Sequence, residues 1–272
     1  MTGRLVICPT PIGNLEDVTL RVLSALREAD VVACEDTRRT RVLLDRYGVK
    51  ARLVSYHEHN EKARASELVR RMRDGAVVAL VSDAGMPLIS DPGFLLVRGC
   101  VAAGLPVEVL PGPSAAITAL VASGLPADEW HFHGFLPRKK GELRRLITET
   151  GGTLVAFESP RRVATTLALV AELDPEREVA VCRELTKAHE EIVRGSAAEL
   201  ASRYADAPPK GEVVLVLGPP TAPDGRSAGE PAGIDALRRL VDAGAHPRKA
   251  AAVVAELTGG SANALYRALT AR

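Results

Sequence analysis

Short, largely apolar segments separated by amphipathic segments constrain the fold of this chain more than any other feature. Each has hydrophobic side chains at consecutive positions, so both faces of a strand there would be buried. They are RLVIC (4–8), VVAC (31–34), RLVSY (52–56), AVVALV (76–81) and PVEVL (106–110). Strands of this kind that alternate with helices are typical of a parallel sheet covered on two sides. We therefore expect an α/β fold.

A second series of strands and helices follows Ser114. We expect its strands at residues 153–157, 178–182, 191–194 and 212–217. Helices are expected at residues 17–27, 41–47, 61–73, 92–103, 114–123, 161–172 and 197–204. The chain thus divides into two α/β domains, residues 1–112 and 113–218, each with its own sheet.

Composition changes after the second series. The segment GPPTAPDGRSAGEPAG is rich in Pro and Gly, and we expect a linker at residues 219–233. Residues 234–272 are expected to form a small helical tail that resembles a helix-turn-helix. That arrangement is used on nucleic acids and is equally common as a packing unit.

Bulk composition is that of a soluble globular protein. The 272 residues are 46% hydrophobic and 25% charged, and the formal net charge of +1 gives no overall attraction to nucleic acid. The four cysteines are far apart, which favours buried thiols over disulfides or metal ligands. No targeting segment or membrane-length apolar run is present, so we expect a cytoplasmic protein.

Several common site motifs are absent from the sequence. There is no GxGxxG after the first apolar segment and no GxxxxGK[ST] loop for nucleotide phosphates. HEH (57–59) lacks the spacing that places two histidines on one helix face, and we expect no metal site. GPSAA (112–116) is not a nucleophile elbow, because Ala116 replaces the final glycine.

Gly, Pro and acidic residues gather where the expected strands of the first domain end. These segments are CPTPIGNLED (8–17), CEDTRRTR (34–41), SDAGMPLISDPG (82–93) and PGPSAA (111–116). Ligands of open parallel sheets bind beyond the carboxyl ends of the strands, where Gly lets the backbone approach closely. Each segment alone could be a helix cap or a simple turn. Four together, without a phosphate loop, indicate a pocket for a nucleoside-like ligand.

These and later motifs resemble the ribosomal RNA small-subunit methyltransferase I family of the tetrapyrrole-methylase-like group. The matching segments run from about residue 4 to 218: TPIGNLEDVTLR (10–21), CEDTRRTRVLL (34–44), LVSDAGMPLISDPG (80–93), LPGPSAAITALVASGLP (110–126), FHGFLPRKKG (132–141), FESPRRV (157–163) and RELTKAHEE (183–191). So many ordered motifs make chance similarity improbable.

The resemblance implies a specific reaction. Members transfer a methyl group from S-adenosyl-L-methionine to the ribose 2′-oxygen of a cytidine in the decoding region of 16S ribosomal RNA. Their fold has two α/β domains with the cofactor in the cleft between them, usually in a homodimer. The partner would be 16S ribosomal RNA within the small ribosomal subunit. No association with a membrane is expected.

The resemblance also implies cofactor contacts. They are expected at Pro11, Asp83, Gly85, Met86, Ser114 and Ala115. The family usually has Thr where this chain has Met86, which changes the packing of the pocket. Because the backbone there is expected to matter most, we expect activity to be retained.

A ribose hydroxyl is a weak acid, so a base or strong hydrogen bonding should help to remove its proton. The candidates at strand ends are Glu35, Asp36, Glu184 and His189, and we place Asp36 first. Asp36 could instead cap a helix, and Glu184 could pair with Arg183 or Lys187.

Basic residues flank the expected cleft and are candidates to bind RNA phosphates. They are Arg38, Arg138, Lys139, Lys140, Arg161 and Arg162, with further arginines at 39 and 41 and in the tail at 248. A solvated helix face is the alternative for residues 138–145.

Two other functions remain open. A methyltransferase acting on a small tetrapyrrole-like metabolite would use the same fold, but it would not need the basic segment or the helical tail. A non-catalytic RNA-binding protein would be expected to have a disrupted cofactor loop, yet Asp83, Gly85, Pro87 and Ser114 are all present.

Overall fold

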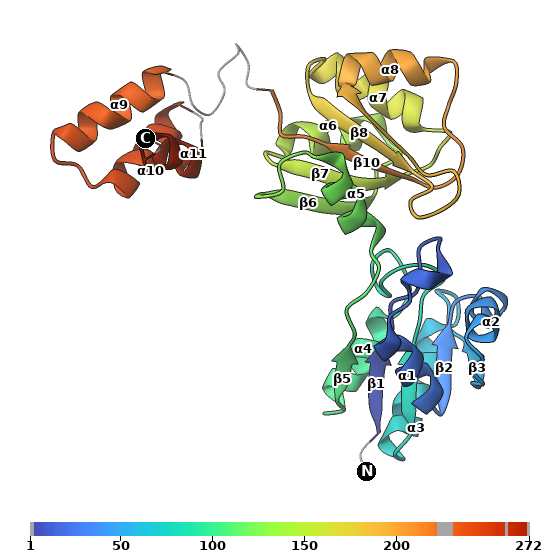
Figure 1. Cartoon of the computed structure of the whole chain (residues 1–272). Coiled ribbons are helices and arrows are strands. Elements are labelled where there is room, and N and C mark those ends of the chain that lie inside the picture. Colours follow the sequence, from blue (N-terminus) through green and yellow to red (C-terminus); the bar gives the residue numbers. More distant parts are fainter. Residues whose placement is uncertain (1–2, 222–230, 259–260, 271–272) are drawn as a thin grey trace. The chain divides into compact units, whose positions relative to one another are not determined.

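The computed structural model (Figure 1) describes residues 3–221, 231–258 and 261–270. Two compact units are present, Met1–Pro219 and Pro220–Arg272. The first unit contains two five-stranded sheets, one built from β1 to β5 and the other from β6 to β10. The predicted linker at 219–233 lies mostly outside the described residues, as does the turn before the last helix.

The first sheet is parallel throughout, as the apolar segments predict. Its strand order is β3 (Leu53–Ser55), β2 (Val31–Cys34), β4 (Val77–Leu80), β1 (Arg4–Ile7) and β5 (Val107–Val109). The carboxyl ends of all five strands therefore meet at one edge. The loops after β1, β2, β4 and β5 leave from this edge, and they are the Gly-, Pro- and acid-rich segments of the sequence.

Helices cover both faces of this sheet. On one face, α3 (Glu61–Arg73) and α4 (Phe94–Ala102) pack on the core that contains Leu5 and Ile7. On the other face, α1 (Leu20–Glu28) and α2 (Thr37–Arg46) pack on the core that contains Val6 and Cys8. Alternate residues of β1 thus point to opposite cores, which explains why its sequence has no polar face.

The second sheet is mixed, so the parallel pattern holds for the first sheet only. Its order is β6 (Trp130–Phe135), β7 (Thr153–Glu158), β10 (Val213–Leu217), β8 (Glu178–Arg183) and β9 (Glu191–Ser196). β10 runs antiparallel to both of its neighbours. One face is covered by α5 (Ala115–Ser123) and the other by α6 (Lys140–Glu149), α7 (Val163–Leu173) and α8 (Ala197–Ala205).

Four elements differ from the sequence predictions. The helix expected at residues 41–47 is α2 (Thr37–Arg46), which begins earlier because the Asp36 side chain caps it. The helix expected at residues 17–27 is a short 3₁₀ turn, η1 (Leu15–Asp17), followed by α1, because the Thr19 side chain caps α1 by accepting a hydrogen bond from the Val22 N–H at 3.1 Å. Strand β6 was not predicted. α6, considered only as an alternative for the basic segment, is a helix of ten residues.

The second unit consists of α9 (Pro231–Asp242), α10 (Pro247–Thr258) and α11 (Ala262–Thr270). Its small core is built around Leu237, Val254 and Leu265. No helix among the described residues combines the length and apolar character needed to span a membrane. The four cysteines are buried free thiols, as predicted.

Candidate functional site

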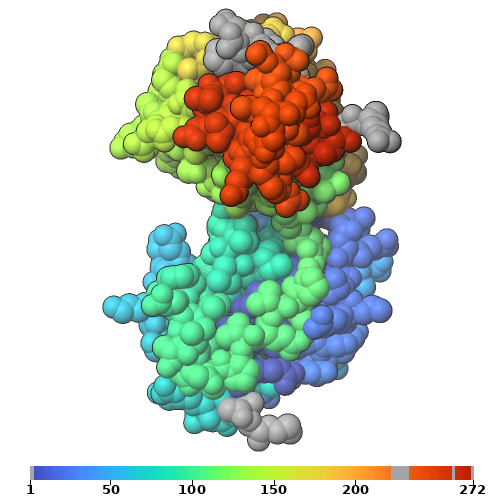
Figure 2. All heavy atoms as spheres, turned by 90° about the vertical axis from the view of Figure 1, so that its left-hand side faces the viewer, coloured from blue at the N-terminus to red at the C-terminus, as the bar shows by residue number. Residues whose placement is uncertain are grey.

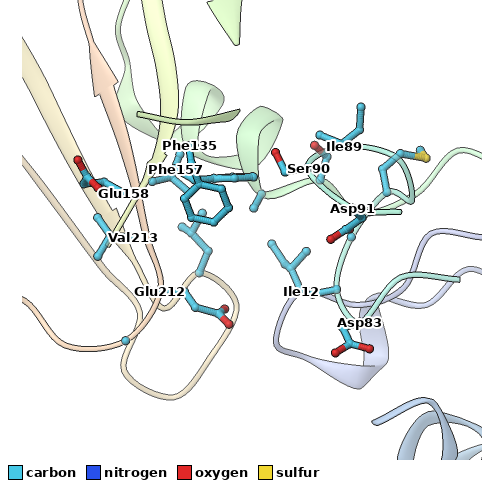
Figure 3. A pocket seen from close by; sticks show the side chains of 18 of the residues that line it. Ile12, Asp83, Ile89, Ser90, Asp91, Phe135, Phe157, Glu158, Glu212 and Val213 are labelled. Atoms are coloured by element: carbon cyan, nitrogen blue, oxygen red, sulfur yellow. The ribbon is translucent and has the colours of Figure 1, made fainter. Parts of the chain in front are cut away.

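A cavity of about 500 Å³ lies in the first unit, lined by loops from both sheets (Figure 3). The first sheet contributes residues 83–86 and 89–91 after β4, together with Glu35 after β2 and Ile12 after β1. The second sheet contributes the end of β7 and the segment that leads into β10. This volume is within the range of sites that hold a cofactor-sized molecule.

One wall of the cavity is the loop that follows β4, held in place by the loop that follows β1. Thr10 and Gly85 exchange two backbone hydrogen bonds of 2.9 Å, and the Thr10 hydroxyl donates to the Ser82 carbonyl at 3.1 Å. The Ser82 hydroxyl donates in turn to the Gly85 carbonyl at 3.0 Å. The two loops thus form one rigid backbone surface.

The backbone conformation at position 85 requires glycine. Its φ is +78°, a left-handed value that favours glycine, and an added Cβ would lie 3.3 Å from Ile12 Cγ2. Leu88 and Ser90, farther along the same loop, also have positive φ values of 73° and 66°. Such conformations are costly for residues with side chains and cluster at functional sites.

The start of α5 also reaches the cavity. Ser114 is the N-cap residue, yet its side chain makes no capping hydrogen bond, and Ser114 and Ala115 both line the cavity. The first N–H groups of a helix are unpaired within the helix and carry a partial positive charge. This end of α5 can therefore bind an electronegative group of a ligand.

Aromatic side chains from the second sheet form the facing wall (Figure 3). Phe135 and Phe157 lie on β6 and β7, with ring centroids 5.5 Å apart in an edge-to-face arrangement. Phe135 is 64% exposed. Val213 and Val214 at the start of β10 extend this apolar surface. It is suited to a flat, weakly polar group such as a nucleobase.

Three carboxylates, Glu35, Asp83 and Asp91, line the wall opposite the aromatic rings. Burial and the neighbouring charges of Glu35 and Asp83 raise the pKa of Asp91 to about 6. Burial and the charge of Asp83 also raise the pKa of Glu35. Arg39 is the nearby cation, with its Nη1 atom 3.5 Å from Asp83 Oδ2. The wall is therefore suited to a cationic ligand.

The structure brings most of the predicted cofactor residues to the cavity. Asp83, Gly85, Met86, Ser114 and Ala115 line it, whereas Pro11 does not. The Asp83 carboxylate is already engaged, because its Oδ1 accepts a hydrogen bond from the Asp36 N–H at 3.0 Å. Asp83 therefore joins the loops after β2 and β4.

The three predicted catalytic carboxylates lie in different environments. Glu35 lines the cavity, but Asp36 and Glu184 do not. Asp36 caps α2, and hydrogen bonds from the side chain and backbone of Arg38 lower its pKa to about 2. Glu184 accepts from Lys187 Nζ at 2.8 Å and from the Glu212 N–H at 2.9 Å, which lowers its pKa. Both have the structural roles that the sequence left open, and neither is poised to accept a proton at neutral pH.

The predicted RNA-binding residues lie outside the cavity lining and differ in their partners. Lys139 and Lys140 pair with Glu142 and Glu172. Arg38 pairs with Asp36.

The remaining three arginines also differ. Arg162 donates to the Leu136 and Pro137 carbonyls at 3.1 and 2.6 Å and approaches the buried Glu158, so it supports the fold. Arg138 and Arg161 are exposed, and the structure pairs neither with an acid of the described residues.

Sequence reasoning missed part of the site. Asp91, Phe135 and Phe157 were quoted within their motifs but given no role in the site, and residues 212–217 were predicted only as a strand. The GEVV segment (211–214) carries no distinctive residue pattern, so only the fold brings it to the cavity. Among the described residues, no group of three or more His, Cys, Asp or Glu side chains could hold a metal ion.

Comparisons with known proteins agree with this architecture. Residues 4–201 match the family described as Tetrapyrrole (Corrin/Porphyrin) Methylases, and residues 228–272 match the RsmI C-terminal HTH domain. Uroporphyrin-III C-methyltransferase from Thermus thermophilus, solved in complex with S-adenyl homocysteine, has the same fold. The TM-score is 0.56 at 23% identity, covering 79% of this chain and 97% of that one.

Sequence relatives extend over most of the chain. Proteins named Ribosomal RNA small subunit methyltransferase I are 50% identical over 270 residues in Mesorhizobium japonicum (97% of this chain, 90% of that one) and 45% identical over 276 residues in Escherichia coli O157:H7 (97% and 94%). The relative of that name from Thermotoga maritima is 46% identical over 217 residues, 79% of this chain and 98% of its own length. The chain therefore belongs to the tetrapyrrole methylases and, within them, to the ribosomal RNA small subunit methyltransferase I family.

Proposed function

We propose that this protein transfers the methyl group of S-adenosyl-L-methionine to the 2′-hydroxyl of a cytidine ribose in 16S ribosomal RNA. The observation that carries the proposal is the cavity, in which a wall of three carboxylates faces two aromatic rings. The chain's membership of this family supports it. The donor supplies an electrophilic methyl group on a positively charged sulfur. The protein's task is then to hold the acceptor oxygen in line with that methyl.

The residues of the cavity fit this donor. Glu35, Asp83 and Asp91 favour its positive charges, while Phe135 and Phe157 offer an apolar surface to its base. No phosphate loop is needed, because the donor has no phosphate. The product lacks the sulfonium charge, so the carboxylates also favour donor over product.

We propose that RNA is contacted by Arg138 and Arg161. Arg138 lies in the loop between β6 and α6, and Arg161 lies just before α7. Both are exposed and free of acidic partners among the described residues. Exposed guanidinium groups bind phosphates in one or two hydrogen bonds and make the binding salt-dependent. We propose that the protein acts in the cytoplasm, on ribosomal RNA within the small subunit.

We propose that the protein is a homodimer whose interface includes α4, β5 and α5. β5 is an edge strand of the first sheet. In Figure 2 the side of the molecule that carries α4 and β5 faces the viewer. Exposed apolar side chains lie on these elements: Phe94, Leu95, Val101, Val109, Ile117 and Val121. Exposed apolar side chains and an open sheet edge are both favourable to association.

The dimer proposal predicts the effect of a charge in this surface. Val121→Asp should give a monomer in sedimentation velocity, because Val121 is 76% exposed on α5 and a buried charge is costly. Val253→Asp is the matched control, since Val253 is 51% exposed on α10 and should leave the dimer intact. A wild-type protein that sediments as a monomer at micromolar concentration would contradict the proposal.

The function itself is tested with labelled donor. Small ribosomal subunits from cells that lack this enzyme are incubated with the protein and S-[methyl-³H]adenosylmethionine, and ribose methylation is mapped along the 16S RNA. One methylated cytidine is expected. The fold also suits methylation of a small tetrapyrrole, and uroporphyrinogen is therefore included as the competing acceptor. Label in that acceptor and none in RNA would replace the proposal by the alternative.

A further inference from the structure

Asp91 has a position in the cavity that none of the predicted bases shares. It lies in the turn Asp91–Pro92–Gly93, directly before α4, and its carboxyl group points into the cavity toward the aromatic wall (Figure 3). The preceding residue, Ser90, has a left-handed φ of 66°. The chain therefore enters the turn through a residue in an uncommon backbone conformation.

A single side chain, Glu61 at the start of α3, fixes this turn from behind. Its Oε1 atom accepts hydrogen bonds from the N–H groups of Gly93 at 2.9 Å and Leu95 at 3.1 Å. The hydroxyl of Tyr56, which is 1% exposed, donates to the same oxygen at 3.0 Å. Gly93 is the N-cap of α4 and has no side chain, so Glu61 replaces the missing cap.

The segment HEHN (57–60) holds Glu61 in turn. Asn60 accepts a hydrogen bond from the His57 N–H at 3.0 Å and donates to the Ser55 carbonyl at 3.2 Å. These bonds shape the chain between β3 and α3. This segment, in which no metal site is expected, thus helps to bring Glu61 to the turn that carries Asp91.

The surroundings of Asp91 suit proton transfer. The groups that act on it are Glu35 after β2, Asp83 after β4 and the Ser82 hydroxyl of its own loop. Arg39 on α2 lies beside Asp83 and Glu35, and Glu158 and Glu212 line the cavity from the second sheet. Burial and the two acids together raise the pKa of Asp91 to about 6. A base with a pKa near the working pH combines ionisation with useful basicity.

We propose that the Asp91 carboxylate accepts the proton of the ribose hydroxyl and that Glu61 is the positioning residue that holds Asp91 in place. As the proton moves to Asp91, the ribose oxygen forms its bond to the methyl carbon and the carbon–sulfur bond breaks. The electron pair of that bond stays on sulfur, which becomes neutral. Asp91 then returns the proton to solvent.

The test uses the full-length protein with small ribosomal subunits, and it rests on the proposed function. Asp91→Asn should lower kcat at pH 8 by about 10²–10⁴-fold, while the Kd for S-adenosylmethionine measured by calorimetry changes less than tenfold. Asp91→Glu should restore part of the loss. In the wild type, kcat should rise with pH and level off above about 7, and this dependence should vanish in Asp91→Asn.

Controls separate the possible failures. Asp45→Asn changes an exposed carboxylate on α2 and should have wild-type kinetics. If the wild type transfers no methyl group to the subunit, the proposed function fails. If it does, and Asp91→Asn keeps more than half of its kcat, Asp91 is not the base. If Glu35→Gln instead removes the pH dependence, the assignment to Asp91 is overturned in favour of Glu35.

Glu61 is tested by a property that simple loss of stability would not change. Glu61→Gln keeps an acceptor oxygen but loses the charge that favours the N-terminus of α4. We expect kcat to fall about tenfold with the KM for RNA unchanged and the pH dependence displaced. Tyr56→Phe, which removes one of the three donors, should have a smaller effect of the same kind. An unchanged pH dependence in Glu61→Gln would remove Glu61 from the proposal.

Discussion

Hydrogen-bond donors decide the role of each carboxylate near the cavity. Asp36 receives several donors from Arg38, and Glu184 receives Lys187 and a backbone N–H, so both stay ionised well below neutral pH. Asp91 has two acidic neighbours and few donors, and its pKa rises to about 6. The ionisable group is a carboxyl in each case, and the difference comes from what surrounds it.

Asp91→Asn should make the folded protein more stable at pH 8. The folded pKa of about 6 lies above the value of about 4 expected in the unfolded chain. The unfolding free energy therefore decreases as pH rises from about 4 to about 6. Above pH 6 the ionised Asp91 carboxylate continues to destabilise the folded state by this full amount. Because the carboxyl is only partly removed from water, the gain on replacing it is about 1–2 kcal/mol.

Urea denaturation at pH 8 and at pH 4.5 measures this difference. The gain should be present at pH 8 and largely absent at pH 4.5, where the folded wild type already binds the proton. Asp45→Asn should show no such pH-dependent gain. A loss of stability in Asp91→Asn at pH 8 would mean that the Asp91 carboxylate is better solvated or paired than its neighbours suggest.

The sequence predicted that the loop after β4 would lie at the candidate site, as it does, but it did not distinguish the carboxylates. SDAGMP is recognisable because Gly85 permits a left-handed backbone and Pro87 fixes its own φ, and such preferences are local. Arg38, two residues from Asp36, lowers the pKa of Asp36 locally, whereas the raised pKa of Asp91 depends on Glu35, which follows a different strand of the sheet. Contacts of this kind follow from the sheet order and cannot be read from neighbouring residues.

The apolar patterns predicted where most strands lie, but they did not predict whether neighbouring strands run parallel or antiparallel. VVLVL in β10 is buried at every position, as a parallel strand would be, yet β10 is antiparallel to both neighbours. β6 was missed because His131, His133 and Gly134 interrupt its apolar residues. Gly134 has a φ of +72°, and the β6–β7 pairing shifts between Phe132 and Phe135. A bulge there displaces the side-chain alternation on which the pattern depends.

Replacement by Met should destabilise the protein at one of the two adjacent arginines before α7 and have little effect on stability at the other. Arg162→Met removes hydrogen bonds to two carbonyls and leaves Glu158, which is 3% exposed, without its cation. We expect a loss of about 3 kcal/mol in unfolding free energy. Arg161 is exposed, and Arg161→Met should change stability by less than about 0.5 kcal/mol.

Activity should show the reverse order. Arg161→Met should raise the KM for small ribosomal subunits, because one phosphate contact is lost. The slope of log binding constant against log salt concentration should become shallower by about 1. Arg162→Met should keep its salt dependence under conditions where it is folded. Equal salt dependence in Arg161→Met and wild type would exclude Arg161 from the RNA contact.

The two compact units of the whole molecule predict separable roles. The tail has its own core around Leu237, Val254 and Leu265, and the cavity lies wholly within Met1–Pro219. The Thermotoga maritima relative is covered over 98% of its length by 79% of this chain, so it lacks a counterpart to roughly a fifth of it. We therefore expect the first unit to carry out methyl transfer without the second.

A chain that ends at Pro219 should fold, bind S-adenosylmethionine as the full chain does and retain its kcat, since no cavity residue is removed. Its KM for the small ribosomal subunit should rise about tenfold, because the basic side chains of α9 and α10, Arg238, Arg239, Arg248 and Lys249, are lost as phosphate contacts. Replacing Arg238 and Arg239 by Glu in the full chain should reproduce part of that rise without shortening the protein. An unchanged KM in both variants would show that the tail does not bind RNA, and failure of the shortened chain to unfold cooperatively would show that the first unit needs the second.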